Sequence, residues 1–362
     1  MTSPAGEGRT FPCRNCGAKL HYDATTQRLR CPYCEHEQPI APAGAVQIRE
    51  IELEAGRELA RSGFGAPLSQ THCNDCGADV VVSAGEITAA CAFCGSHQVL
   101  PREASGRVIR PESLVPFRVD AAKARADFAR WLKRLWFRPN DLRRVARIQS
   151  LEGVYVPFWT FDATVASRWS ADAGYHYYVT ETYTDPQGRR ATRQVQHTRW
   201  QAASGGRGDA FDDLIVCASA GLAKPLADEF RSWNTAELVP YTPEYLAGWK
   251  TESYALDLEP AWALAREQIE ATQRSRCAGD VPGDTYRHLS VSNAISGVTF
   301  KHVLLPVWVA AYRYRGAPYQ LLVNGQSGEV VGRAPYSVWK ILLFVLLMLL
   351  AAAIVAWLTQ QG

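Results

Sequence analysis

The sequence has little net charge. It contains 39 Lys and Arg residues against 36 Asp and Glu residues, which gives a net charge of +3. Such a chain has no overall attraction to nucleic acid or to acidic surfaces, so any basic partner site has to be local. Met1–Thr10 also lacks an apolar run behind a basic start, which predicts that there is no cleaved secretory signal. We therefore expect the N-terminal bulk of the protein to be cytoplasmic.

The usual signatures of catalysis are missing. The segment Gly248-Trp-Lys-Thr251 lacks the Gly-Lys pair and the upstream glycine of a phosphate-binding loop, which excludes ATP-driven chemistry of that kind. No nucleophile, base and orienting group can be assembled from the spacing, so we predict a protein that is not an enzyme. We interpret Gly205-Gly-Arg-Gly208, with Asp209, Asp212 and Asp213, as a polar loop rather than as a phosphate or cation site.

One long apolar run stands near the C-terminus. Ile341–Leu358 comprises 18 consecutive apolar residues without a charge, about 27 Å of helix against roughly 30 Å of hydrocarbon. Lys340 precedes the run, and Trp339 and Trp357 stand at its ends, as is typical of a membrane span with a cytoplasmic N-terminal side. We therefore predict a single-pass, tail-anchored protein. A buried core helix is the alternative, and the absence of a polar face disfavours it.

Eight of the ten cysteines fall into four Cys-x-x-Cys pairs, and the second two pairs repeat the first two at an offset of 60 residues. This matched spacing indicates one module used twice. The predicted metal ligands are Cys13, Cys16, Cys31 and Cys34 in the first module and Cys73, Cys76, Cys91 and Cys94 in the second.

Structural zinc explains these quartets better than disulfides do. A reducing cytosol keeps thiols free, and each fragment of about 30 residues is too small to fold on its own core without a metal. Four cysteine ligands also fill a tetrahedral zinc ion and leave no position for a catalytic water. We predict two structural Zn²⁺ ions, with iron in a rubredoxin-like site as the alternative.

The quartets resemble the zinc ribbons of the TFIIB type, which suggests nucleic-acid binding. The charge of the second module opposes that function, because Thr71–Leu100 has no Lys or Arg but contains Asp75, Asp79 and Glu86.

A basic segment follows the second module. Arg118–Ser150 contains ten Lys and Arg residues against three Asp residues. Asp120 is a suitable N-cap for a helix that extends to about Phe137. The first interpretation is a solvated helix face, the second is contact with anionic lipid headgroups, and the third is nucleic-acid binding. The basic face would consist of Lys123, Arg130 and Arg134.

Residues 151–336 are rich in aromatic side chains and predict an α+β domain. Alternation in Tyr175–Tyr183 and again in Val195–Trp200, across a turn at Asp185-Pro-Gln-Gly188, predicts a β-hairpin. A helix is expected over Leu258–Arg276. Val156-Pro-Phe-Trp159 and Leu305-Pro-Val-Trp308 share a Pro-x-Trp core, which suggests a weak internal duplication. Their prolines predict strand starts or sheet edges.

Five segments carry a family resemblance. They are Leu114-Val-Pro-Phe117, Trp136-Phe-Arg-Pro139, Gly153-Val-Tyr-Val-Pro-Phe-Trp-Thr-Phe-Asp-Ala163, Leu305-Pro-Val-Trp308 and Val323-Asn-Gly-Gln-Ser-Gly-Glu-Val-Val-Gly332. Together they resemble a bacterial family of double zinc-ribbon membrane proteins, which are often labelled as related to primosomal protein N′ helicases. Some relatives look like membrane partners of phage-shock and SPFH-type envelope-stress proteins, so the resemblance implies partners of those kinds.

The sequence thus predicts a multidomain protein with two zinc ribbons, an α+β strand-rich aromatic domain and one C-terminal transmembrane helix. The expected segments are a first ribbon (1–42), a helical linker (43–70), a second ribbon (71–104), a basic helical segment (105–150), the aromatic domain (151–336) and the span (338–358). We expect a non-enzymatic membrane adaptor that recruits cytosolic proteins, and the resemblance implies a role in envelope stress. A membrane-tethered nucleic-acid binder is the main alternative, and a hydrolase or transferase in the aromatic domain is the third.

Overall fold

The structure is a computed structural model of the 362-residue chain. It describes residues 11–41, 48–62, 69–81, 90–103, 109–139, 141, 151–184, 186, 188–314 and 317–361.

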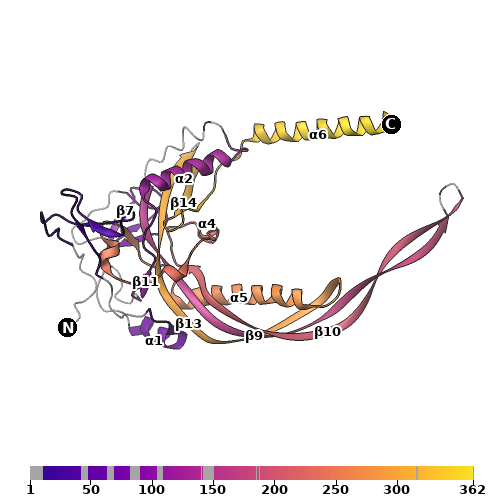
Figure 1. The fold of residues 1–362 in the computed structure, drawn as a ribbon, viewed down its shortest axis with the longest axis horizontal. Helices are drawn as coiled ribbons and strands as arrows, with labels where there is room; N and C mark the ends of the chain where they lie inside the picture. Colours follow the sequence, from indigo (N-terminus) through magenta and orange to yellow (C-terminus); the bar gives the residue numbers. More distant parts are fainter. Residues whose placement is uncertain are drawn as a thin grey trace.

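Two long antiparallel strands form the centre of the fold. Strand β9 (Leu151–Thr184) pairs with β13 (Thr285–Tyr314) from its first residue as far as Gly174. With 34 residues, β9 corresponds to about 110 Å of extended chain, far more than a small domain needs. Its outer part leaves the body together with β10 (Arg190–Cys217), as Figure 1 shows.

We call this projection the arm. It consists of the outer parts of β9, β10 and β13 with helix α5 (Leu258–Asp280) packed along them. Beyond Gly174, β9 pairs with β10 alone among the described residues. We call this outermost two-stranded part, within Tyr175–Trp200, the distal arm.

Shorter elements complete the body. A twelve-stranded sheet takes in β14 and several short strands, and helix α2 (Ala121–Arg134) covers its other end. The remaining strands and helices of the body are β4 (Ile51–Glu52), α1 (Leu53–Ser62), β8 (Ser113–Leu114), α4 (Lys224–Ala227), η1 (Thr235–Glu237), β11 (Val239–Pro240), η2 (Pro243–Leu246), β12 (Lys250–Glu252), β14 (Ala317–Asn324) and β15 (Val330–Gly332).

Several sequence predictions are confirmed. The hairpin has the expected strands, with Thr184 paired to Arg190. Helix α2 begins after Asp120, whose carboxylate accepts a hydrogen bond from the Lys123 backbone N–H at 2.7 Å. Helix α5 also lies where periodicity placed it.

The predicted glycine-rich loop is wrong, because Gly205–Gly208 and the following aspartates lie within strand β10. Glycine is needed at position 205 for packing rather than for a turn. A Cβ atom there would lie 2.6 Å from the Trp169 ring, which occupies the space above the strand.

The prediction that Pro157 and Pro306 mark strand starts or edges is also wrong, since both lie inside the central strands. Each proline stands where its strand changes neighbours. At Pro157, β9 passes from β12 to β10, and at Pro306, β13 passes from β8 to β14. A missing N–H costs little at such a position, because the ladder is interrupted there on one side.

These two positions belong to an internal duplication, which the structure supports far beyond the Pro-x-Trp motif. Two units have the same order: β8–α2–β9–β10 and β12–α5–β13–β14. The first short strand of each unit pairs in parallel with the long strand of the other. The long strands pair antiparallel about a central couple, Val156 and Leu305, so that a local two-fold axis relates the units.

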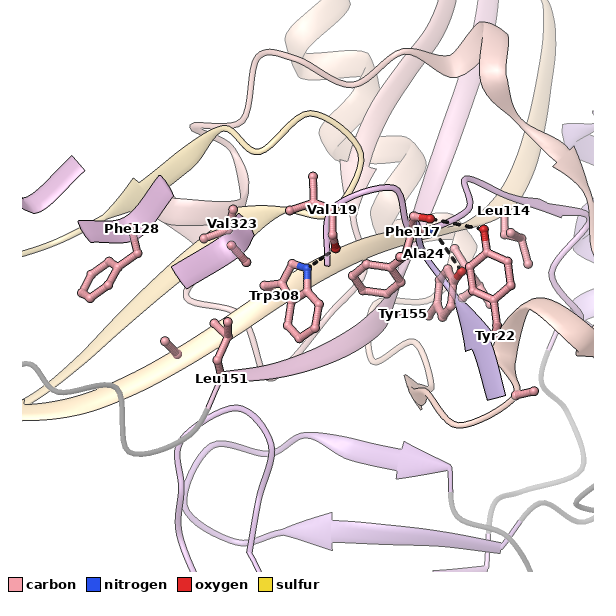
Figure 2. Close-up of a cluster of buried hydrophobic side chains, with 14 of the residues drawn as sticks. Tyr22, Ala24, Leu114, Phe117, Val119, Phe128, Leu151, Tyr155, Trp308 and Val323 are labelled. Atoms are coloured by element: carbon pink, nitrogen blue, oxygen red, sulfur yellow. Dashed lines mark hydrogen bonds between the residues drawn. The ribbon is translucent and has the colours of Figure 1, made fainter. Parts of the chain in front are cut away.

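The matched contacts extend to single hydrogen bonds. The ring N–H of Trp308 donates to the Val119 carbonyl at 2.8 Å, and that of Trp159 donates to the Leu256 carbonyl at 2.9 Å. Each acceptor immediately precedes the aspartate N-cap of a helix. Each tryptophan therefore fixes the start of a helix against a central strand, and Figure 2 shows the Trp308 bond.

We expect Trp308→Phe to lower the free energy of unfolding by roughly 1 to 3 kcal/mol, because the buried Val119 carbonyl loses its donor. Trp233→Phe is the control, since the Trp233 ring N–H has no hydrogen-bond partner among the described residues. Denaturant unfolding of the full chain in detergent measures both. Equal effects of the two changes would show that the hydrogen bond contributes nothing beyond ring packing.

Candidate metal centres

Each cysteine quartet lies in a small β module. Module 1 (residues 11–41) is built on a three-stranded sheet of β1 (His21–Asp23), β2 (Arg28–Arg30) and β3 (Glu37–Gln38). Module 2 (residues 69–81 and 90–103) is built on β5 (Ser69–Cys73), β6 (Asp79–Val81) and β7 (Val99–Glu103). Each module contains two Cys-x-x-Cys turns, and both turns lie next to its strands. Pairing of these strands brings the two turns together.

The predicted quartets are brought together in both modules. The four Sγ atoms of each quartet lie within 4.8 Å of one another. The Cys13–Cys34 and Cys16–Cys31 separations are 3.6 and 3.5 Å. In module 2 the corresponding Sγ pairs, Cys73–Cys94 and Cys76–Cys91, are both 3.6 Å apart.

These separations fit a tetrahedral ion with sulfur ligands. A Zn–S bond of about 2.3 Å implies an edge of roughly 3.8 Å between sulfurs. All four sulfur ligands come from one module in each case, so each quartet forms a closed site. The donor set suits zinc, and four thiolates also suit iron.

The turns have the backbone geometry that metal-binding loops require. In each of the four turns, the residue directly after the second cysteine donates its backbone N–H to the carbonyl of the first cysteine. These residues, which are Gly17, Glu35, Gly77 and Gly95, have φ between 57° and 77°. Glycine suits this left-handed conformation. Backbone N–H groups of Asn15 and Phe93 also point at sulfurs, each at 3.4 Å.

The thiols of each quartet share protons unevenly. Hydrogen bonding from Cys76 lowers the pKa of the Cys91 thiol to about 5, and the backbone N–H of His36 lowers the pKa of Cys34 to about 6. The backbone N–H of Ala18 lowers the pKa of Cys16, but hydrogen bonds with the neighbouring thiols and burial together raise it to about 12. A bound cation would replace these shared protons, because metals bind the thiolate form.

Module 1 packs against the centre of the body. The Tyr22 hydroxyl and the Gln27 side chain both donate to the Phe117 carbonyl, at 3.2 and 2.7 Å. Phe117 in turn stacks on Trp249, with ring centroids 3.9 Å apart. Figure 2 shows Tyr22 beside Phe117 and Tyr155 in this buried cluster.

Module 2 is joined to the body more directly, because β6 pairs with β12 in the large sheet. The fully buried ring of Phe93 lies on Gly221, where a Cβ atom would approach to 2.4 Å. Beside this contact, the buried Glu252 carboxylate accepts hydrogen bonds from the backbone N–H groups of Ala220 and Gly221 at 3.1 and 2.9 Å.

A third cluster of possible metal ligands consists of aspartates, and a lysine pairs with it. Asp162, Asp212 and Asp213 come together where β10 and β13 both carry a bulge opposite β9. The buried Lys301 ammonium lies 2.8 Å from Asp213 and 3.6 Å from Asp162. Burial opposes its charge, but Asp213 and the other nearby carboxylates raise the pKa of Lys301. Sequence patterns could not predict the pairing with Lys301, because this residue is distant in the chain from all three aspartates.

The predicted basic face of α2 needs a correction. Lys123 and Arg130 both pair with the buried carboxylate of Asp127, each at 2.8 Å. The acidic residue thus belongs to the same patch as the two bases and partly neutralises it. Arg134 is exposed in the last turn, as expected.

Helix α6 (Val338–Gln361) is long and apolar enough to cross a membrane over Val338–Thr359, and none of that segment is buried in the body. The segment that follows α2 contacts the N-terminal end of α6. The Phe137 carbonyl accepts from the Ser337 N–H at 2.7 Å, and the Phe137 and Phe344 rings meet edge to face. Trp136 and Trp339 are mostly exposed beside this joint.

The structure therefore defines a protein with two four-cysteine clusters, a strand-rich aromatic body and an apolar C-terminal helix. In comparisons with known proteins, no family and no solved structure matches the chain. The chain is 27% identical over 346 residues to the uncharacterized protein YdjG of Bacillus subtilis (strain 168). The alignment covers 92% of each protein, so the similarity includes nearly the whole architecture.

We expect elemental analysis to find two zinc ions per chain, because both quartets are complete. Cys73→Ser should reduce the zinc content to near one ion per chain. The quartet of module 1 contains no residue of module 2, so its ion should be retained. Cys277→Ser is the control, because Cys277 lies on the buried side of α5 and belongs to neither quartet. Loss of both metals after Cys73→Ser would show that the two sites are not independent.

Burial raises the pKa of Glu252 from 4.5 to about 7, although Ser219 and two backbone N–H groups favour the carboxylate. The folded state therefore holds a proton that the unfolded state releases, and stability falls as the pH rises from about 4.5 to 7. The loss amounts to at most about 3 kcal/mol.

Glu252→Gln removes this titration, so its stability relative to the unsubstituted protein should increase between pH 5 and pH 8. Denaturant unfolding at both pH values measures the difference. Glu267→Gln, at an exposed position on α5, should give the same difference at both. A flat profile for Glu252→Gln would contradict the assigned protonation.

Proposed function

We propose that this protein is a non-enzymatic, zinc-binding adaptor that α6 holds at the cytoplasmic face of a membrane and that binds partner proteins through its arm. The observation that carries the proposal is the arm itself. Strands β9 and β10 extend well beyond the part that β13 and α5 cover, and the distal arm exposes aromatic side chains such as Tyr177 and Tyr178. Exposed apolar side chains gathered on a projection favour a binding surface.

The metal centres support a structural role. Four cysteines would occupy every position of a tetrahedral zinc ion, which leaves none for a water or a substrate. Both modules are buried against the body through Tyr22 and Phe93. Zinc would therefore stabilise the platform that carries the arm.

The surroundings of α6 support membrane attachment. Trp136, Tyr336 and Trp339 are 76%, 66% and 82% exposed around the base of the helix. Amphipathic rings favour the headgroup layer, so these side chains would lie at the membrane surface. Arg138 stacks on Tyr336 at 3.7 Å, which adds a cation at the same level.

A membrane-spanning α6 requires one rearrangement. Figure 1 shows α6 and the arm leaving the body toward the same side. The distal arm carries charged residues such as Arg193 and Glu181, which are costly in hydrocarbon. In the membrane, α6 would turn away from the arm at residues 333–337, which form no regular structure.

Phage-shock and SPFH-type proteins are the candidate partners that the family resemblance implies. Nucleic-acid binding has less support, because Asp127 partly neutralises the basic face of α2 and module 2 contains acidic residues such as Asp79.

Affinity purification of the full chain from membranes in mild detergent tests the proposal. We expect recurrent partner proteins, and we expect to lose them when an Asn-Gly turn replaces Tyr178–Gln196. Retained zinc and unchanged unfolding would show that the shortened protein still folds. High-salt washing should not release the full chain, whereas deletion of Ile341–Leu358 should. Co-purifying nucleic acid without protein, or release by salt alone, would contradict the proposal.

A further inference from the structure

We infer that the distal arm binds an amphipathic, acidic helix of a partner protein on the face that α5 covers nearer the body. This inference rests on the proposed adaptor function and specifies the class of partner. We call this surface the α5 face. It is the face formed by the odd-numbered residues of β9 from Ala163 outward, with the residues of β10 and β13 paired to them.

The first argument is continuity with a surface already covered by a helix. Along the inner arm, the β9 side chains of the α5 face are buried, including Val165, Trp169 and Ala173. Val165 packs with Ile269 of α5 in one hydrophobic cluster, and Trp169 packs with Cys277 of α5 in another. The α5 face is therefore built to receive a helix.

The second argument is where α5 ends. Its last residue is Asp280, and the chain then turns into β13, whose first pair is Thr285 with Gly174. The same stripe continues outward without cover, through Tyr177, Val179 and Tyr183, which are 49%, 41% and 42% exposed. The apolar pattern of β9 thus extends beyond the helix that occupies it.

The opposite face of the distal arm differs in chemistry. Its paired positions are mostly Thr and Gln, as in Thr180 with Gln194, although Tyr178 also lies there. Among the described residues of the arm, the exposed large apolar side chains are Tyr177, Tyr178, Val179, Tyr183 and Tyr286, and all but Tyr178 belong to the α5 face. One face alone is therefore suited to an apolar partner.

The duplication supports a helix as the occupant. At the opposite end of the fold, which the local two-fold axis relates to the arm, α2 covers the sheet, with Phe128 and Leu132 buried against it. Both halves thus use a helix to cover the strands that run outward from the central couple. The uncovered stripe of nine residues, Tyr175–Tyr183, is about 30 Å long and matches roughly 20 residues of helix.

Charge indicates the sign of the partner. The segment Tyr175–Trp200 contains four arginines against Glu181 and Asp185. On the α5 face beside the apolar stripe, Arg193 pairs with Glu181 at 3.1 Å, while Arg199 lies opposite Tyr175 and adds a positive charge. Acidic side chains flanking the apolar side of the partner helix would pair with this excess of positive charge.

Site-specific photo-crosslinking in the full chain, in membranes of the source cells, tests the inference. Benzoylphenylalanine is placed at Val179 or Val195 on the α5 face, and at Thr180 or Gln194 on the opposite face as matched controls. We expect the α5-face probes to label one acidic segment of a partner at residues spaced three, four and seven apart. The control probes should label it at least tenfold less.

Binding of a synthetic peptide with the captured sequence then provides a second measurement. We expect Val179→Lys in the full chain to weaken the peptide at least tenfold and Thr180→Lys to change its affinity less than twofold. Arg199→Glu should also weaken binding, and more strongly at low salt.

The other occupants give different results, and each would overturn the inference. Labelled residues spaced two apart would indicate a strand added to the open edge of β9. Labelling of this same chain in a neighbouring molecule would indicate a second copy. Equal labelling from both faces, or none, would also refute it. If shortening the arm still abolishes partner recovery in any of these cases, the adaptor function stands and only the helix is wrong.

Discussion

The pairing of β9 with β13 about Val156 and Leu305 determines the rest of the structure. Both side chains are fully buried, and a shift of one residue would turn the buried face of β9 in the inner arm, from Ala163 to Ala173, toward solvent. The register also places Trp159 and Trp308 symmetrically about the central couple. Each ring then reaches the carbonyl just before a helix N-cap, so the pairing positions α5 and α2 as well as the strands.

The two halves have diverged mainly in length. In the half that contains α5, the strands continue far past the body and form the arm. In the half that contains α2, the hairpin of β13 and β14 is shorter, and the segment after α2 meets the base of α6. One end of the duplicated fold has thus become a projection and the other a support for the C-terminal helix. The proposed adaptor would use the first end for its partners and the second for the membrane.

Local patterns in the sequence predicted what depends on neighbouring residues. Cysteine spacing identified both quartets, Asp120 identified a helix start, and alternation identified the hairpin, because each rests on contacts within a few residues. The strand character of Gly205–Gly208 could not be predicted, since it depends on Trp169 packing from the neighbouring strand. The two prolines were misplaced for a similar reason. They are tolerated because two other strands end beside them, and no local pattern shows where a strand changes partners.

Lys301 shows how a distant residue changes the meaning of a motif. Three carboxylates in two adjacent strands resemble a cation site, but an ammonium group from the third strand already pairs with two of them. The lysine is separated by about 90 residues or more from each aspartate, so only the sheet reveals the pairing. Both neighbours of β9 bulge at this level, which is where the arm leaves the body. The ion pairs therefore join all three strands at the base of the arm.

The metal modules complete the same core from outside. Each module is too small to bury its own apolar residues, and each presents an aromatic ring to the body. Tyr22 closes the Phe117 cluster that contains Trp308, while Phe93 closes the cluster beside Glu252 and the end of β10. Metal binding at these clusters would therefore be linked to the folding of the body, because neither surface is buried without the other. Loss of a metal would expose the aromatic clusters that hold the central strands in register, and so would loosen the base from which the arm projects.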